Sequence, residues 1–408
     1  MYNLFLNILI IVDQICLKKG RFVLLTLNFT APHLPEYGGL FTAHEAFRKV
    51  GNGKIVDVVG RQDFGKTYSD LQLRVGGFGI KNNYGIPFPL SYAKNYDEIY
   101  RMGRDEQVSL IVIHSLFSDQ AVYGYKIAKH LGIPYLFVPH GVLDPYIFSY
   151  NKIRKNTWMK IFGNKIIAGA SSVICATSNE AEKAAPFLKE SKIDICEWGI
   201  QIPDKITRDL WRQEMRRALK IAEKDKVLLF LGRMNSMKRP VEIAKRFVGA
   251  QNKGWTLLMV GYFESLKIVD ELRLLSAAFP NIILHDAITG LKKWKLFAAS
   301  DAFIHLSERE NFGYSVVEAA AMSLPLVLSK GVDVYPYFAS GSAFVSQDYQ
   351  PKNEIFTVEK MLNSSKEKLI SMGEKSSIVV KENFTLQKFN TQLTNIFLKY
   401  SKKIREEV

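Results

Sequence analysis

Cysteine is scarce in this chain of 408 residues. Cys16, Cys175 and Cys196 are scattered along the sequence, and none belongs to a C-x-x-C pair. The sequence therefore supports neither a disulfide framework nor a zinc site. A reducing compartment is the simple interpretation, so we expect a cytoplasmic protein.

Long apolar runs are also missing. Residues 1–12 (MYNLFLNILIIV) are apolar, but they are fewer than the roughly 20 residues that cross a bilayer. They lack the basic start and the small-residue cleavage site of a signal peptide. Two interpretations stay open, a segment lying on a membrane surface or an extension before the first strand, and we favour an extension over residues 1–19. We expect no transmembrane segment elsewhere.

The composition excludes a disordered or collagen-like chain. Hydrophobic residues make up 47%, aromatic residues 12% and charged residues 23% of the sequence, as in a well-packed globular protein. A prior of about 150 residues per domain predicts two or three domains. The net charge of +15 indicates anionic partners such as phosphates, nucleic acid or an acidic membrane surface.

Short runs rich in β-branched residues alternate with amphipathic stretches almost throughout. This alternation is typical of βαβ units and of parallel sheets that are buried on both faces. The sequence predicts strands over residues 21–28, 55–60, 109–115, 134–141, 171–178, 194–200, 226–233, 255–261, 281–287, 301–307, 325–329 and 342–346.

The β pattern lapses between residues 200 and 226, where a proline precedes a strongly charged helical stretch. This is the best linker candidate. We expect one α/β domain over residues 1–203, a second over 204–383, and a C-terminal helix over 384–408 that packs on a domain. Two doubly wound domains in tandem form a cleft at the carboxyl ends of their strands, where ligands bind in such folds.

Residues 307–325 (SERENFGYSVVEAAAMSLP) carry the densest chemical signal. They follow a strand and pass through a glycine turn into an alanine-rich helix. Glu310 before the turn and Glu318 within the helix are placed to flank a ligand at the helix start. Backbone N–H groups there are suited to an anion or to sugar hydroxyls; they belong to Asn311, Phe312, Gly313 and Tyr314.

A carboxylate beside such amides accepts two hydroxyls of a ribose or a pyranose, so a sugar is the natural ligand. The alternative makes Glu310 a partner of the helix dipole and Glu318 a solvated helix residue.

A second motif lies in residues 229–240 (LFLGRMNSMKRP), where a strand leads through Gly232 to Arg233 and Lys238. The glycine permits close backbone approach, and two cations beside a helix start neutralise a diphosphate without a metal. The alternative is that both are exposed, solubilising basic residues.

The first half holds two further candidates. Gly38 and Gly39 follow the first strand and open a helix, where they meet either a phosphate or the neighbouring sheet. His140 lies at the carboxyl end of another strand, which favours a place in the expected cleft over a purely structural role.

These four segments, in their order along the chain, resemble the retaining family-four glycosyltransferases of GT-B architecture over nearly the whole chain. The family's Glu-x7-Glu element matches Glu310 and Glu318. Its Gly-Arg-x4-Lys donor-phosphate motif matches Gly232, Arg233 and Lys238.

The N-terminal half also matches. The family's Gly-Gly loop corresponds to Gly38 and Gly39, and His140 falls where its donor-contacting histidine lies. Residues 139–146 (PHGVLDPY) look like those of members that build bacterial surface polysaccharides.

The sequence departs from the family at three places. Residues 1–19 precede the family's normal first strand. Asn311 replaces the commoner glycine, and Arg239-Pro240 replaces the usual glycine after the lysine.

The resemblance implies two Rossmann-like domains facing across a cleft, with the C-terminal helix returning towards the N-terminal domain. It implies that Arg233 and Lys238 contact the leaving diphosphate and that Glu318 contacts the nucleotide ribose. It places Glu310, with the amides of Asn311, Phe312 and Gly313, on the donor sugar.

The resemblance also implies the reaction: a hexose-type sugar passes, with retention, from a UDP- or GDP-sugar to a saccharide or lipid-linked saccharide in surface polysaccharide synthesis. No Asp-x-Asp element is present, so we expect Arg233, Lys238 and a helix N-terminus to replace a metal at the leaving phosphate, and no cofactor. Retention by front-face attack would explain why no dedicated nucleophile stands out. The alternatives are a catalytically silent GT-B scaffold or partner subunit and, less favoured because no nucleic-acid module appears, a nucleic-acid binder.

Residues 150–165 (YNKIRKNTWMKIFGNK) mix five cations with Trp158, Met159 and Phe162. Such a surface suits a peripheral enzyme at the cytoplasmic face of the inner membrane. A solvated helix whose aromatic side chains pack inward is an equal alternative.

Overall fold

The computed structural model describes strands β1 (Leu25–Thr30) and β2 (Lys54–Val59), Ala43 and Phe47, and residues 108–401 except Glu190, Asp204 and Lys253. The chain forms two compact units. Unit 1 comprises Met1–Cys175, Lys183–Asp194 and Asn390–Val408, and unit 2 comprises Ala176–Glu182 and Ile195–Phe389. The expected boundaries at residues 203 and 383 stay a prediction.

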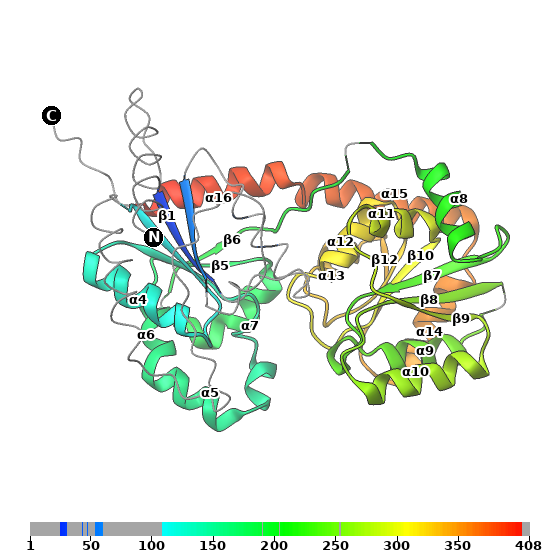
Figure 1. The fold of residues 1–408 in the computed structure, drawn as a ribbon, viewed down its shortest axis with the longest axis horizontal. Coiled ribbons are helices and arrows are strands. Elements are labelled where there is room, and N and C mark those ends of the chain that lie inside the picture. The colour runs from blue at the N-terminus through cyan, green and yellow to red at the C-terminus, as the bar shows by residue number, and fades with distance from the viewer. Residues whose placement is uncertain are drawn as a thin grey trace, which may run out of the picture. The chain divides into compact units, whose positions relative to one another are not determined.

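Unit 1 contains a six-stranded sheet in the order β2-β1-β3-β4-β5-β6 (Figure 1). The strands after β2 are β3 (Leu110–His114), β4 (Tyr135–Val138), β5 (Ser172–Cys175) and β6 (Ile193–Ile195). The pairs from β2 through β5 are parallel, and the order reverses between β1 and β3 as in doubly wound folds. The helical segments are α4 (Asp119–Leu131), η3 (Pro145–Ser149), α5 (Lys152–Trp158), η4 (Met159–Gly163), α6 (Asn164–Ala168) and α7 (Ser178–Leu188), the last of which begins in unit 2.

Unit 2 contains a second six-stranded parallel sheet in the order β12-β11-β10-β7-β8-β9. This is the Rossmann order, with its reversal between β7 and β10. The strands are β7 (Lys226–Leu231), β8 (Trp255–Gly261), β9 (Ile282–Asp286), β10 (Ala302–His305), β11 (Leu326–Ser329) and β12 (Ala343–Ser346). Every expected strand is therefore present, and the predicted α/β class is confirmed.

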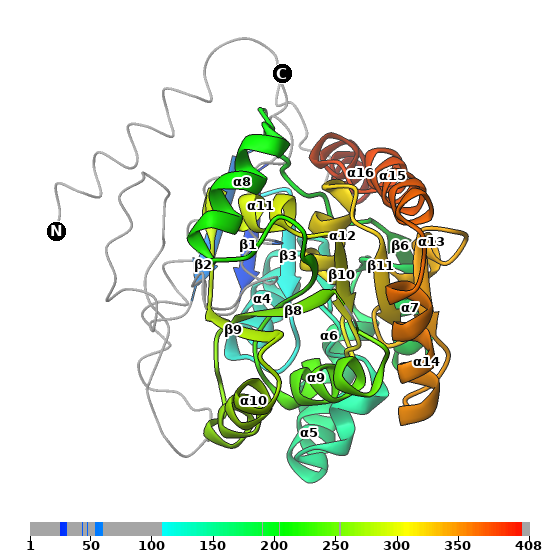
Figure 2. The same cartoon turned by 90° about the vertical axis from the view of Figure 1, so that its right-hand side faces the viewer.

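Helices cover both faces of the unit 2 sheet, as Figures 1 and 2 show. On one face lie α9 (Pro240–Gly249), α10 (Leu266–Ala278) and α14 (Pro351–Leu362); on the other lie α8 (Arg208–Ala218), α11 (Gly290–Ala299) and α12 (Tyr314–Ala321). The remaining elements are η5 (Ser236–Lys238), α13 (Tyr335–Phe338) and α15 (Lys366–Asn383), which packs on α12. All seven residues of β8 are buried, because a parallel sheet between two helical layers has no solvated face.

The charged stretch that we expected as a linker folds into unit 2. In it, α8 packs against α11, and the fully buried guanidinium of Arg216 donates to Asp301 over 2.8 Å. Arg212, one turn earlier, donates to the same carboxylate over 2.9 Å. Two arginines on one carboxylate fix the helix to the sheet, so the middle of the expected linker is part of unit 2.

The C-terminal helix is α16 (Leu386–Tyr400), which starts in unit 2 and continues into unit 1 from Asn390. In unit 1 its Lys399 donates to Asp194 over 2.9 Å. Across the residues that the structure describes, no helix combines the length and the apolar character needed to span a bilayer. The proposed extension over residues 1–19 lies outside the described residues.

Candidate active site

The predicted donor-site residues of unit 2 follow three adjacent strands. In the order β11-β10-β7, each strand ends at the same edge of the sheet, and the loops that follow bond to one another. The amide of Glu308 donates to Met237 O over 3.0 Å, and that of Glu310 donates to Gly331 O over 2.7 Å. These loops meet where the strand order reverses, which is where ligands bind in doubly wound sheets.

The loop after β7 holds Arg233 and Lys238 in defined places. The side chain of Asn235 accepts a bond from the Lys238 amide over 3.1 Å and so caps the short helix η5. Its amide group donates to Glu264 over 2.8 Å, and Arg233 donates to the other oxygen of Glu264 over 2.9 Å. The carboxylate of Glu264, in the loop after β8, therefore orients the guanidinium of Arg233.

Arg239 explains how the chain departs from the family motif after the lysine. Its backbone has φ +54°, the left-handed region where glycine is favoured, so an arginine here adopts a conformation that a glycine takes without strain. The guanidinium is buried and donates to both oxygens of Glu354 over 2.5 and 3.1 Å. Pro240 then occupies the first turn of α9, where no amide donor is needed.

Lys238 and Glu310 form an ion pair at the centre of this site. The ammonium contacts Glu310 Oε2, which also lies 3.3 Å from Nε2 of His305 at the end of β10. The side chains of Lys238 and Glu310 are 11% and 20% exposed, so the pair is shielded but not sealed. A ligand that enters the site therefore meets a cation and a carboxylate side by side.

Burial determines the protonation of this cluster. Burial and the charges of Arg233 and Arg309 together lower the pKa of Lys238 to about 7, and burial is the largest of these causes. Burial also holds the pKa of His305 well below its usual value, so the ring is neutral and donates to Glu310. An ionised Glu310, or an incoming phosphate, opposes the shift at Lys238 and favours its charged form.

The segment from Glu310 to α12 has the form that the sequence predicts. Gly313 has φ +79° and caps the helix, and a side chain there would press on Glu310 and Val332. Among the described residues, the backbone N–H groups of Asn311, Phe312 and Gly313 have no acceptor. Three donors at a helix start therefore lie next to the Glu310 carboxylate, an arrangement suited to an anion or to hydroxyls.

Glu318 lies within α12 and has a partner of its own. It is 6% exposed and accepts a bond of 2.5 Å from Lys293 of α11. Burial raises the pKa of Glu318, and the charge and the hydrogen bond of Lys293 oppose that rise. The alternative of a solvated helix residue is therefore wrong for Glu318.

The structure brings some predicted residues together and separates others. Lys238 and Glu310 are in contact, and Arg233 lies near enough to perturb the lysine, whereas Glu318 pairs elsewhere. Sequence reasoning missed several supporting residues, namely Asn235, Glu264, Lys293, His305 and Glu354. Only Glu354 left a signal, since it shares the apolar stripe of α14 with Val358 and Met361.

In unit 1, His140 follows β4 with φ +51°, and its Nε2 lies 2.7 Å from Nδ1 of His114 at the end of β3. Burial lowers the pKa of His140 to about 3, so its ring is neutral, and one of the two rings donates to the other. Sequence reasoning missed His114. The predicted Gly38 and Gly39 lie outside the described residues.

Comparisons with known proteins agree with this organisation. The family model described as Glycosyltransferase Family 4 matches residues 46–202, and the model described as Glycosyl transferases group 1 matches residues 212–376. No curated protein matches the chain.

Solved structures with similar folds cover most of the chain. HepE of Anabaena in complex with UDP-glucose is 16% identical, with a TM-score of 0.68 over 92% of this chain and 99% of its own. Sucrose-phosphate synthase of Thermosynechococcus elongatus is 14% identical, with a TM-score of 0.71 over 92% and 98%. WaaG, a glycosyltransferase involved in lipopolysaccharide biosynthesis, is 15% identical, with a TM-score of 0.64 over 91% and 99%.

At these identities the solved structures establish the fold alone, which is GT-B. The two family models account for both halves of the chain in the expected order. The chain therefore belongs to the group 1, family-four glycosyltransferases.

Proposed function

We propose that this glycosyltransferase transfers a hexose-type sugar from a UDP- or GDP-sugar, with retention and without a metal, to a saccharide or lipid-linked saccharide acceptor in surface polysaccharide synthesis. The observation that carries the proposal is the Lys238–Glu310 pair beside the three bare amides of residues 311–313. One site then offers a cation for a phosphate, and a carboxylate with amides for a sugar.

The Lys238–Glu310 pair indicates how each residue takes part in donor binding. A diphosphate that reaches Lys238 replaces the carboxylate as its counter-ion and favours the ammonium form. Glu310 is then free to accept sugar hydroxyls, while Arg233 supplies a second cation. As the anomeric C–O bond breaks, its electron pair stays on the β-phosphate oxygen, and preorganised cations stabilise that charge by about 2.7–4 kcal/mol each. The anomeric carbon bonds to the oxygen of the acceptor hydroxyl, whose proton passes to the leaving phosphate.

The donor class is supported by the complexes of HepE with UDP and with UDP-glucose, and the acceptor class by the role of WaaG in lipopolysaccharide biosynthesis. Metal independence is supported by the two cations at the site. Within the described part of the chain, no group of three or more His, Cys, Asp or Glu side chains is placed to hold a metal ion.

Peripheral membrane contact is proposed for residues 150–165. Trp158 packs inward and donates to Leu116 O over 2.9 Å, but Ile153 is 86% and Ile161 51% exposed among solvated cations. Apolar side chains within a cationic surface suit anionic lipid. Sedimentation with anionic liposomes at low salt tests this, with Ile153→Ser as the variant that should weaken binding, and absence of binding would refute it.

Thermal unfolding with UDP, GDP, ADP and their glucose conjugates tests the donor proposal. The correct nucleotide should add about 2.7 kcal/mol of stability at a hundredfold excess over its Kd. Transfer should persist in excess EDTA, and NMR of the product should show the donor's anomeric configuration.

Glu310→Gln keeps the shape of the side chain and removes the charge, so it should abolish transfer while nucleotide stabilisation is largely retained. Glu308→Gln, in the same loop, is the matched control. If no nucleotide stabilises the protein and the unsubstituted protein transfers no sugar, the chain is a silent scaffold instead. If Glu310→Gln remains fully active, the role proposed for Glu310 is wrong.

A further inference from the structure

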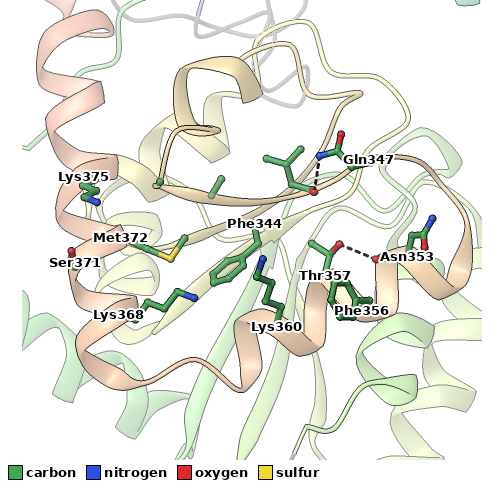
Figure 3. A pocket seen from close by; sticks show the side chains of 13 residues that line it. Phe344, Gln347, Asn353, Phe356, Thr357, Lys360, Lys368, Ser371, Met372 and Lys375 are labelled. Carbon is green, nitrogen blue, oxygen red and sulfur yellow. Dashed lines mark hydrogen bonds between the residues drawn. The ribbon is translucent and has the colours of Figure 1, made fainter.

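A pocket of about 720 Å³ lies at the β12 edge of the unit 2 sheet, between α14 and α15 (Figure 3). The volume is in the range of small-molecule sites. None of the residues that line it belongs to the donor site. The pocket is therefore a separate concave feature of the same unit.

Three lysines give the pocket its charge. Lys360 comes from α14, Lys368 and Lys375 come from α15, and the lining contains no Asp or Glu. Figure 3 shows the ammonium ends of Lys360 and Lys368 directed towards Phe344, and Nζ of Lys368 lies 5.5 Å from the centre of that ring. Within the described residues, none of the three forms an ion pair, so their charges are available to an anion.

The remaining lining suits a ring that bears hydroxyl groups. Phe356 is 65% exposed at the rim, although it belongs to a helix whose other face is buried. An exposed aromatic ring stacks on the apolar face of a sugar. Gln347 and Ser371 also line the pocket and provide an amide and a hydroxyl, which are the groups that bind sugar hydroxyls in protein sites.

The pocket lies on a different face of α14 from the residue that anchors the donor loop. Asn353, Phe356 and Lys360 face the pocket, whereas Glu354 is fully buried and holds Arg239. Substitutions of the exposed lysines therefore leave the anchor of the donor loop in place.

We propose that this pocket is a second binding site, distinct from the donor site, for a phosphorylated saccharide. The phosphate lies among the three ammonium groups, and the sugar ring lies against Phe356. The proposal goes beyond the donor-site function, because it requires only that the pocket binds.

Calorimetry with the full chain tests it, using glucose 6-phosphate, inorganic phosphate and glucose as probes. Saturating UDP is present throughout, and its own binding is measured first, so a failure of the donor proposal is recognised separately. The triple variant Lys360→Gln, Lys368→Gln, Lys375→Gln removes the pocket charge. The triple variant Lys352→Gln, Lys366→Gln, Lys381→Gln removes three exposed charges from the same helices outside the pocket.

Glucose 6-phosphate should bind more tightly than inorganic phosphate, and glucose should not bind measurably. The Kd of glucose 6-phosphate should rise about tenfold or more in the pocket variant and less than about twofold in the control. Phe356→Ala should remove the preference for glucose 6-phosphate over inorganic phosphate. Equal losses in both triple variants, no binding of glucose 6-phosphate, or equal affinity for inorganic phosphate would overturn the proposal.

Discussion

Lys238 and Arg239 are neighbours in the sequence, yet their charges meet different surroundings. The ammonium of Lys238 contacts a carboxylate that is 20% exposed, and burial lowers its pKa to about 7. The guanidinium of Arg239 donates to both oxygens of Glu354, whose side chain has no exposed surface. Burial alone would lower the pKa of Arg239, but the hydrogen bonds and charge of Glu354 raise it overall.

The difference separates a chemical role from a structural one. A guanidinium stays charged and binds a carboxylate through two parallel bonds, which suits a fixed anchor. A lysine has a single rotatable ammonium whose pKa responds to its partner, which suits an exchange between Glu310 and a phosphate. Arg239 fixes the backbone of the loop, so that Lys238 can exchange Glu310 for a phosphate.

Glu354→Gln breaks the structural side of the comparison and should have the largest effect. Both Arg239 and Arg246 donate to this carboxylate, so its removal leaves two cations without their counter-ion. We expect the free energy of unfolding to fall by about 3–5 kcal/mol, measured by urea denaturation. Glu359 lies on the same helix and accepts an exposed hydrogen bond from the backbone amide of Gln251. Glu359→Gln should lower the free energy of unfolding by less than about 1 kcal/mol. Equal losses would show that the buried anchor is not special.

Lys238→Met breaks the chemical side. Transfer should fall by about 10²–10³-fold, since one preorganised donor at the leaving group is lost. Stability at pH 7 should not fall, because a buried lysine with a lowered pKa holds its proton less tightly in the folded than in the unfolded chain. Between pH 7 and the unfolded pKa of the lysine, the charge of Lys238 therefore does not contribute to the free energy of unfolding.

Transfer rates and urea midpoints measure the two quantities on the same sample. Lys245→Met, an exposed lysine of α9, is the control and should change neither. A large loss of stability in Lys238→Met would instead assign the lysine a structural role like that of Arg239.

The pH dependence of UDP affinity sharpens the comparison. A diphosphate favours the ammonium form, so the bound pKa of Lys238 lies above the free value of about 7, and binding takes up a proton at pH 8. The Kd should rise by roughly fivefold from pH 7 to pH 8. Calorimetry in two buffers of different ionisation enthalpy counts the protons. Lys238→Met should show neither effect, and a Kd independent of pH in the unsubstituted protein would contradict the assignment.

Sequence patterns predicted most of the fold and the two donor-loop motifs. The strands are runs of apolar residues because a doubly covered parallel sheet buries both faces, and that requirement is visible locally. The motifs are equally local: Gly232, Arg233 and Lys238 lie in one loop, and Glu310 and Gly313 in another.

Partners from distant parts of the chain could not be predicted in the same way. Arg239 departs from the family motif, and Glu354, the carboxylate that binds it, lies 115 residues away. Lys293 reaches Glu318 from a different helix, and Glu264 reaches Arg233 because β8 lies beside β7. Such pairs depend on which strands are adjacent, and the periodicity of a single segment does not contain that information.

Lys293→Met tests the second ion pair of the site and should have the smallest effect. Burial raises the pKa of Glu318, and Lys293 opposes that rise. Without Lys293, the carboxyl group of Glu318 should therefore stay protonated at mildly acidic pH. A protonated carboxyl accepts ribose hydroxyls less strongly. Relative to the unsubstituted protein, UDP should bind about two- to threefold more weakly at pH 6 and equally at pH 8. Calorimetry at both values measures this, with the exposed neighbour Lys292→Met as control. An equal change at pH 6 and at pH 8 would mean that Lys293 contacts the nucleotide directly. The lysine would then not act through the carboxylate of Glu318.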